Sequence, residues 1–447
     1  MLRRWALLPF FLVPVLALAS EGAEHSDPVA RVVISLAIIL LAAKVGGDLA
    51  TRVGQPAVLG ELVFGVLLGN LTLVGFAGLQ YLHTEPSIDM LARIGVLILL
   101  FEVGLESTID QMLRVGLTSL FVALLGVAAP FALGWGVGAL LIPEAGVYVH
   151  AFLGATLCAT SVGITARVLK DLNRSKSPEA RVILGAAVID DVLGLVVLAV
   201  VSGVIAAANA GTEMSFGSIG AIIGKASLFL VGALVLGIFL TPKLFSFASR
   251  LRSPGVLLAA GLSFCFLLSW LANEIGLAPI VGAFAAGLIM EELHYRDFVG
   301  RGEHGLEELV HPISSFLVPV FFVLMGMRTD LRSFAQPGVL GLAAALTLAA
   351  IIGKQACSLG VLGKGIDRLS VGIGMIPRGE VGLIFANIGL ALTMKGAPVI
   401  SQSTFSAVVV MVIVTTMVTP PALKWSLNRG AARKQATPQG EKAAPAS

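Results

Sequence analysis

The sequence predicts an all-α polytopic membrane protein with about 13 transmembrane helices. Of its 447 residues, 57% are hydrophobic and only 13% are charged, and the mean hydropathy is +0.95. Soluble domains carry roughly 25% charged residues. Apolar segments also recur along the chain, each close to the roughly 20 residues that span hydrocarbon as a helix. They cover approximately residues 29–50, 56–73, 88–105, 115–141, 149–168, 182–207, 217–240, 255–273, 277–292, 310–327, 337–361, 369–393 and 401–423.

The beginning of the chain has the pattern of a targeting segment. Arg3 and Arg4 precede an apolar stretch over residues 5–18, which ends in small residues. This pattern predicts a cleavable signal peptide over residues 1–19, with an uncleaved anchor helix as the alternative. Cleavage would leave the mature N-terminus outside the cell.

The basic residues predict the orientation of the helices. With the N-terminus outside, the outer connections contain only Arg328, Arg332 and Lys395, whereas the inner connections and the C-terminal tail contain most of the other basic residues. Cytoplasmic loops are enriched in lysine and arginine, so we expect a multi-pass protein of the inner (plasma) membrane with its C-terminus in the cytoplasm. The net charge of +3 is modest and lies mainly in connections, so we expect the lipid bilayer as a partner and no nucleic acid.

Two adjacent aspartates, Asp190 and Asp191, lie in the apolar run 182–204. One carboxylate at the bilayer centre costs roughly 3 kcal/mol on insertion scales, so such acids usually face a water-filled cavity and bind ions or protons. Asp190 follows the basic residue Arg181 closely enough to lie roughly 14 Å from the cytoplasmic boundary, near the membrane midplane. The pair therefore predicts an ion or proton site. Two acids that only hydrogen-bond to a neighbouring helix are the alternative.

Lys354 approaches the same depth from the other direction. It precedes the cytoplasmic residue Lys364 along segment 337–361, which places its ammonium group roughly 15 Å deep. A buried lysine tends to lose its proton unless a carboxylate lies beside it, so we expect Lys354 to pair with one of the two aspartates. Snorkelling of its side chain to an interface is the alternative.

Two segments contain helix-breaking residues at a comparable depth. Segment 149–168 contains Thr160 and Ser161 beside a glycine, and segment 369–393 contains the run 377–380, Pro-Arg-Gly-Glu. Irregular backbone within a membrane is tolerated where it is buried or lines a cavity, and its carbonyl groups can coordinate a cation. We expect two discontinuous helices, each in the middle of a three-segment unit, and opposite starting sides make the two units an inverted repeat. An ordinary proline kink with a structural Arg378–Glu380 pair is the alternative in the second segment.

Six short strings resemble those of the Kef-type and NapA-like monovalent cation:proton antiporters, and the resemblance extends from about residue 30 to residue 425. The strings are Gln55–Leu62, Leu99–Glu106, Ala159–Gly163, Val188–Gly194, Gly282–Gly287 and Pro377–Glu380. Each is degenerate alone, but all six occur in the expected order and in the expected helices.

The resemblance implies a homodimer in which different segments form different functional domains. Residues 29–105 and 255–327 would form a dimerisation domain, residues 115–207 and 337–423 a mobile ion-transporting core, and residues 217–240 a linking helix. Residues 424–447 would form a cytoplasmic tail that is too short for the nucleotide-binding regulatory domain of fuller Kef-type proteins.

The resemblance also assigns the ion-binding role to Asp191, with Asp190 as its partner, and a salt-bridging role to Lys354. We expect Na⁺ or K⁺ at Asp191 and Thr160, with Ser161 at the same site and with Pro377, Arg378 and Glu380 in support. Transported Na⁺, Li⁺ or K⁺ and H⁺ are the expected ligands. No cofactor and no enzymatic activity are expected.

Three other functions remain open from the sequence. A K⁺/H⁺ antiporter and a Kef-like gated potassium efflux pathway would use the same architecture, the latter without obligatory proton exchange. An organic-anion symporter is the third, because related inverted-repeat folds carry such solutes. The neighbouring aspartates and the lysine at their depth favour proton coupling. Glu61 and Glu102 either line an access funnel or are paired structural acids.

Overall fold

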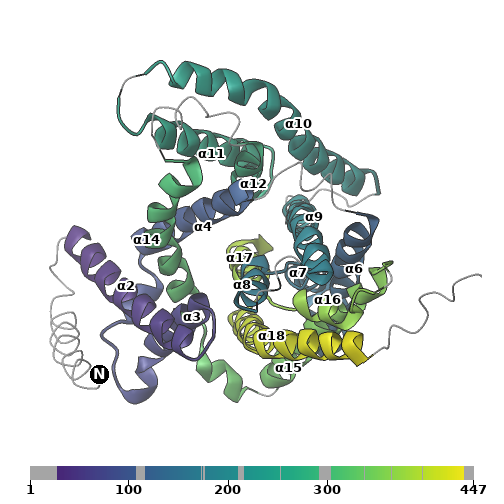
Figure 1. The fold of residues 1–447 in the computed structure, drawn as a ribbon. Coiled ribbons are helices and arrows are strands. Elements are labelled where there is room, and N and C mark those ends of the chain that lie inside the picture. The colour runs from purple at the N-terminus through teal and green to yellow at the C-terminus, as the bar shows by residue number, and fades with distance from the viewer. Residues whose placement is uncertain are drawn as a thin grey trace, which may run out of the picture.

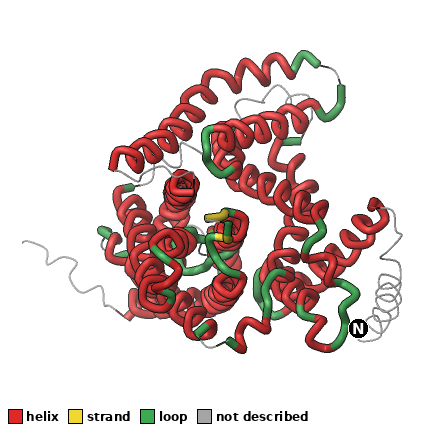
Figure 2. The backbone as a smooth tube through the Cα atoms, turned by 180° about the vertical axis from the view of Figure 1, so that it is seen from behind, coloured by secondary structure: helices red, strands yellow, loops and turns green. Residues whose placement is uncertain are grey.

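The computed structural model describes residues 28–106, 116–172, 174, 177–209, 216–251, 253–290, 304–336, 338–363, 365–394 and 396–436. The expected signal peptide, residues 1–19, lies outside the described residues, as does the end of the expected tail, residues 437–447. Helices dominate the described chain, and the strands β1 (Thr393–Met394) and β2 (Ala397–Pro398) form one small antiparallel ladder (Figure 2).

The helices follow the apolar segments of the sequence. In chain order they are α2 (Pro28–Arg52), α3 (Ala57–Gly69), α4 (Pro86–Glu106), α6 (Leu117–Leu141), α7 (Val147–Thr156), α8 (Val162–Asp171), α9 (Pro178–Asn209), α10 (Phe216–Ala248), α11 (Val256–Glu274), α12 (Pro279–Ile289), α14 (Leu306–Met327), α15 (Val339–Ala356), α16 (Arg368–Gly374), α17 (Glu380–Ala391) and α18 (Gln402–Ala436). The 3-10 helices η2 (Leu71–Val74), η3 (Gln80–His83), η4 (Pro143–Ala145), η6 (Leu331–Ala335) and η7 (Cys357–Gly360) lie at the ends of these helices or between them.

Within the described ranges, seven helical stretches are long and apolar enough to cross a membrane, and four shorter apolar helices accompany them. Phe239 on α10 and Leu348 on α15 are more than half exposed, as on helix faces that contact lipid. The all-α membrane fold is confirmed, whereas the exact number of spans stays a prediction. Helix α18 continues to Ala436, so the expected tail begins as a helical extension rather than at the end of the helix.

The helices pack into two bundles (Figure 1). The first bundle consists of α2, α3, α4, α11, α12 and α14, whose mutual contacts are extensive. Glycines permit close approach between its helices: a Cβ atom added at Gly104 on α4 would lie 2.4 Å from the carbonyl oxygen of Phe284 on α12. Small residues at helix interfaces are typical of membrane bundles, where van der Waals packing replaces the hydrophobic effect between helices.

The second bundle consists of α6, α7, α8, α9, α15, α16, α17 and α18. Helix α10 contacts α9 of this bundle and α11 and α12 of the first, and it arches between the two in Figure 1. Apart from α10, the two bundles face one another across a boundary that includes parts of α4, α14, α9 and α17.

The second bundle contains the expected repeat. The order of a long helix, a broken helix and a second long helix occurs in α6 to α9 and again in α15 to α18. Helices α6 and α15 run antiparallel, because Gly353 lies against Pro130 whereas the later Gly360 lies against the earlier Val122. An antiparallel contact between the first helices of the two units is what an inverted repeat requires.

Both predicted helix breaks are present. Helix α7 ends at Thr156 and α8 begins at Val162, while α16 ends at Gly374 and α17 begins at Glu380. The residues between these ends are non-helical and buried deep in the second bundle. Backbone groups at membrane depth need hydrogen-bond partners within the protein unless they line a cavity.

Candidate functional site

A buried ion pair joins the two halves of the second bundle. The Nζ atom of Lys354, in the last turn of α15, donates a hydrogen bond of 2.7 Å to Oδ1 of Asp190 in the middle of α9. Both side chains have an exposed fraction of 0%. The other carboxylate oxygen of Asp190 has no hydrogen-bond partner in the described part of the chain. Of the two aspartates, Asp190 is therefore the one that pairs with Lys354.

Gly126 on α6 packs directly over this ion pair. A Cβ atom added there would lie 3.4 Å from Nζ of Lys354 and 3.5 Å from Oδ1 of Asp190. The missing side chain at this position leaves room for the ion pair between α6, α9 and α15. Sequence reasoning did not identify Gly126, because a glycine in an apolar span is too common to indicate a site.

The two helix breaks cross and satisfy one another's backbone. The amide of Ser161 donates a 2.9 Å hydrogen bond to the carbonyl of Pro377, and the Thr165 hydroxyl donates a 2.7 Å hydrogen bond to the carbonyl of Gly374. Thr160 makes a longer contact of 3.4 Å with the carbonyl of Met375. Thr160 and Ser161 are thus brought to the centre of the crossing, where both are buried.

Arg378 lies at the same crossing and is fully buried. One Nη atom donates to the carbonyl of Ala159, while its Nε and other Nη atoms have no hydrogen-bond partner in the described part of the chain. The backbone of Arg378 is held by the Thr416 hydroxyl of α18, which donates a 3.0 Å hydrogen bond to its carbonyl. The side chain of Glu380 lies outside the described residues, so the alternative of a structural Arg378–Glu380 pair stays open.

Asp191 faces a different environment from that of Asp190. It lines a cavity of about 420 Å³ between the two bundles, together with Thr160 and Ser161 from the first helix break. Adjacent residues on a helix point about 100° apart, which explains why one aspartate meets Lys354 and the other meets the cavity. Asp191 has an exposed fraction of 8%, compared with 0% for Asp190.

Two further acids, Glu102 and Glu106 of α4, line the same cavity. The Glu102 carboxylate accepts a hydrogen bond from the Ser314 hydroxyl of α14, and it lies 3.0 Å from Nδ1 of His311. Glu102 therefore fits the expected position in an access funnel and is also paired. Glu61 is buried in α3 and does not line this cavity.

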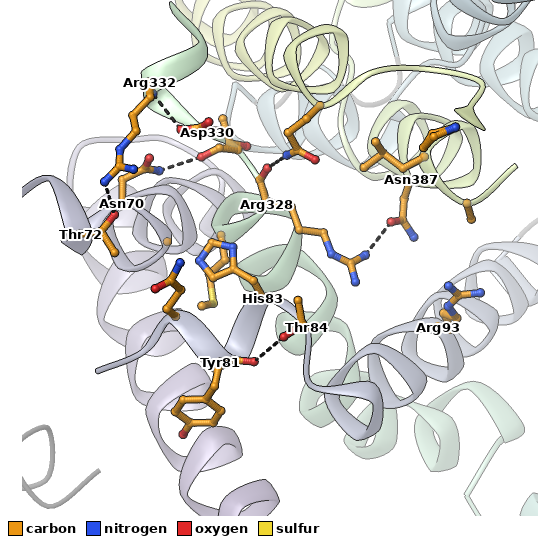
Figure 3. Close-up of a pocket in the computed structure, with 18 residues that line it drawn as sticks. Asn70, Thr72, Tyr81, His83, Thr84, Arg93, Arg328, Asp330, Arg332 and Asn387 are labelled. Carbon is orange, nitrogen blue, oxygen red and sulfur yellow. Dashed lines mark hydrogen bonds between the residues drawn. The ribbon is translucent and has the colours of Figure 1, made fainter. Parts of the chain in front are cut away.

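The bundles also meet at the other end of α4 and α14, where a cavity of about 930 Å³ lies (Figure 3). Arg328, which follows α14, donates a 2.5 Å hydrogen bond to Asp89 of α4 and a 2.9 Å hydrogen bond to Asn387 of α17. Its backbone carbonyl accepts from the side chain of Gln402 at the start of α18. One residue thus ties the first bundle to two helices of the second. The sequence analysis placed Arg328 in an outer connection and did not predict these contacts.

His83 of η3 lines the same cavity. Burial lowers the pKa of His83 below its ordinary value of 6.5, and the positive charge of Arg328 also lowers it. A hydrogen bond with the backbone of Gly69 acts in the opposite direction. His83 therefore binds a proton less readily in the folded protein than in the unfolded chain.

Comparison with known proteins agrees with this arrangement. A family model described as "Sodium/hydrogen exchanger, transmembrane" matches residues 34–429. The chain is 39% identical to the high-affinity Na⁺/H⁺ antiporter NhaS3 of Synechocystis sp., a match that covers 95% of this chain and 96% of that protein. It is 35% identical to the Na⁺/H⁺-K⁺ antiporter GerN of Bacillus cereus over 88% of this chain and 95% of the relative.

A solved structure supports the fold at a greater distance. The sodium proton antiporter MjNhaP1 from Methanocaldococcus jannaschii superposes with a TM-score of 0.64 at 16% sequence identity, covering 92% of this chain and 98% of that one. This likeness extends the agreement from sequence to architecture. On the match of the family model and the identity with full-length relatives, the chain belongs to the sodium/hydrogen exchanger family of membrane transporters.

Proposed function

We propose that the chain exchanges Na⁺ for protons by alternating access and that Asp191 is the cation ligand. The observation that carries this proposal is the contrast between the neighbouring aspartates: Asp190 is paired with Lys354, whereas Asp191 lines a cavity with Thr160 and Ser161. A carboxylate and hydroxyl oxygens are suitable ligands for a small hard cation. The names of NhaS3 and GerN, both Na⁺/H⁺ antiporters, support the choice of cargo.

Competition for a single site couples the two ions. A cation that enters the cavity binds the charged form of Asp191 and disfavours its protonation, while a proton on Asp191 removes the charge that attracts the cation. The Lys354–Asp190 pair lies one residue away from Asp191 along α9. Arg378 supplies a second buried positive charge near Asp190, and with both aspartates ionised the four buried charges cancel.

We also propose how the bundles divide this work. The first bundle, with residues 29–105 and 255–327, is the dimerisation domain of a homodimer in the plasma membrane. The second, with residues 115–207 and 337–423, is the core that moves, and α10 with residues 217–240 links them. The Asp191 cavity lies toward the end of α4 at Glu106, on the side that the positive-inside rule assigns to the cytoplasm. The present conformation is therefore inward-facing.

A K⁺/H⁺ exchanger is the second candidate, and one observation favours it. GerN is named as an antiporter of K⁺ as well as Na⁺, and this relative is 35% identical to the chain. The oxygen ligands at Asp191 and Thr160 suit either ion. Selectivity then depends on the dimensions that the cavity adopts around the bound cation.

Proton flux in proteoliposomes tests both candidates. The purified protein is reconstituted, a pH gradient is imposed, the membrane potential is clamped with an ionophore, and Na⁺, Li⁺ and K⁺ are added in turn. We expect Na⁺ to collapse the pH gradient. A response to K⁺ of equal size would replace the first candidate with the second, and no response to any of the three cations would contradict both.

The matched variants Asp191→Asn and Asp48→Asn test the site. Asp48 is a half-exposed acid of α2 that pairs with Arg52, so the same chemical change there should leave exchange intact. Asp191→Asn should abolish cation-dependent proton flux while the variant still inserts and elutes as a folded protein. Full exchange by this variant would disprove the role of Asp191.

A further inference from the structure

A second cavity lies along the same boundary between the bundles as the Asp191 cavity. Its volume is about 380 Å³, and it is lined among others by Ser202, Phe321, Ile384 and Asn387. It lies toward the Asn209 end of α9, whereas the Asp191 cavity lies toward the opposite end of that helix. The two cavities have no lining residue in common.

Four helices nevertheless line both cavities. Each of α4, α9, α14 and α17 contributes one set of residues to the Asp191 cavity and another set to the second cavity. On α9 the sets are Asp191 with Leu195, and Ser202 with Ala206. The cavities are therefore stacked along the same helices at the boundary between the bundles.

An apolar layer separates the two cavities in this structure. Leu198 of α9 lies between the two sets of lining residues and is fully buried. Phe321 and Phe322 of α14 and Ile384 of α17 are also buried, at exposed fractions of 1%, 1% and 2%. A hydrated cation cannot cross such a layer without losing its water, so the layer closes the way from one cavity to the other.

Ser202 is aligned with Asp191 on α9. The two positions are 11 residues apart, which corresponds to roughly 16 Å along the helix and to three turns plus about 20°. They therefore share one face of the helix. The Ser202 hydroxyl is buried and has no hydrogen-bond partner in the described part of the chain. Buried hydroxyls nearly always have a partner, so this one points to a ligand that joins it.

Asn387 adds a second oxygen to the same cavity. Its side-chain Oδ1 accepts the hydrogen bond from Arg328 in the present conformation, at 2.9 Å. A movement of the bundles apart at this end would break that contact and free the amide oxygen, which belongs to a residue that lines the same cavity as Ser202. Arg93 also lines this cavity and pairs at 2.6 Å with Asp89, the carboxylate that Arg328 shares.

We propose that the second cavity is the outer half of the cation route and that Ser202 and Asn387 bind the cation in passage between the outer solution and Asp191. This inference rests on the proposed function. The cation exchanges part of its hydration shell for the two side-chain oxygens, and the Leu198 layer opens when the second bundle moves. Ser202 then determines the affinity for the cation at the outer side alone.

Thiol labelling in oriented vesicles tests the placement. The background replaces Cys158, Cys265 and Cys357, all buried, by alanine, and it is used once it retains cation-dependent proton exchange. Ser202→Cys is then exposed to a membrane-impermeant, positively charged thiosulfonate from either side. Ser269→Cys is the control, because Ser269 is buried in α11, bonds to the Cys265 carbonyl and lines neither cavity.

We expect labelling of Ser202→Cys from the outer side only, slowed by Na⁺, and no labelling of the control. Labelling from the cytoplasmic side, or none from either side in a variant that still transports, would overturn the proposal. Absence of cation-dependent proton exchange in the unmodified protein would instead contradict the proposed function. Failure of the proposed function is therefore distinguishable from failure of this inference.

Kinetics supply a second measurement that does not depend on cysteine. Ser202→Ala should raise the KM for Na⁺ supplied at the outer side by about threefold to tenfold, the loss of one hydrogen-bond-strength contact. The KM at the inner side and kcat should remain unchanged, and Ser202→Thr, which keeps the hydroxyl, should restore the outer KM. Equal changes at both sides would mean that Ser202 only supports the fold.

Discussion

Replacing Lys354 by methionine removes the positive half of the buried pair and keeps most of the volume of the side chain. At 2.7 Å and an effective dielectric constant of about 20, the attraction between the charges is about 6 kcal/mol. The cost of taking both charges out of water offsets much of this value, and loss of one partner from a buried pair typically costs about 3–5 kcal/mol. Both side chains are fully buried, so solvent does not screen the loss.

The assay is a double-mutant cycle on thermal unfolding in detergent. Lys354→Met should unfold well below the parent protein because Asp190 is left buried and charged. Asp190→Asn combined with Lys354→Met leaves no unpaired charge, and this double variant should recover most of the lost stability. Lys424→Met is the control, since Lys424 is an exposed residue of α18 and the same change there should have little effect.

Two outcomes would refute this reasoning. Lys354→Met with the stability of the parent protein would mean that the pair contributes nothing to the folded state. A double variant whose loss of stability equals the sum of the two single losses would mean that Lys354 and Asp190 act independently of one another. In both cases a group other than Lys354 would have to compensate the charge of Asp190, and the contrast between Asp190 and Asp191 would lose its basis.

The remaining predictions concern the helix crossing and the outer face. Gly379→Ala would place a Cβ atom 2.6 Å from Oγ of Ser161, so it should lower the free energy of unfolding by about 1–3 kcal/mol and slow exchange. The same change at Gly341, where a Cβ atom would meet nothing within 4 Å, should have neither effect. Equal thermal stability of the two variants would contradict the crowding at Gly379. Arg328→Gln should weaken the contact with α17 and increase the share of outward-open protein, measured as faster labelling of an outer-cavity cysteine, and an unchanged labelling rate would exclude Arg328 as a tie between the bundles. The folded-state pKa of His83 is lowered, so the unfolded chain binds the proton first as the pH falls below about 6.5, and protonation destabilises the folded state. His83→Gln should therefore lose less thermal stability than the parent protein between pH 7.5 and pH 5. Parallel pH profiles of the two proteins would refute this prediction.

The sequence was informative about depth in the membrane because a spanning helix rises a fixed distance per residue, so the residue count from a boundary gives the depth. Counting from Arg181 and from Lys364 placed Asp190 and Lys354 at one level, and the structure joins them at 2.7 Å. The helix breaks were equally predictable, because Pro377 and the polar residues beside Thr160 are costly inside a membrane helix unless they have a purpose.

Lateral relations between helices were not predictable in the same way. Depth alone did not decide which aspartate faces Lys354, since both lie at the same level and the choice depends on the rotation of α9. Gly126 and the Ser202 alignment depend on which helix faces are in contact, and apolar residues on all sides of a helix leave no periodic signal for this. Arg328 lies in the connection that follows α14, and amino-acid composition does not determine the conformation of such a connection.

The close contact of α6 with α15 constrains how the second bundle can move. A Cβ atom at Gly353 of α15 would lie 2.8 Å from the Cα atom of Pro130, and one at Gly360 of η7, which directly follows α15, would lie 2.6 Å from the amide nitrogen of Val122. With backbones this close at two points along the contact, one helix cannot slide past the other without a steric clash. The two repeat units are therefore fastened at a fixed register, and each displacement of one carries the other. The movement proposed for the second bundle therefore carries both repeat units together, without shear between α6 and α15.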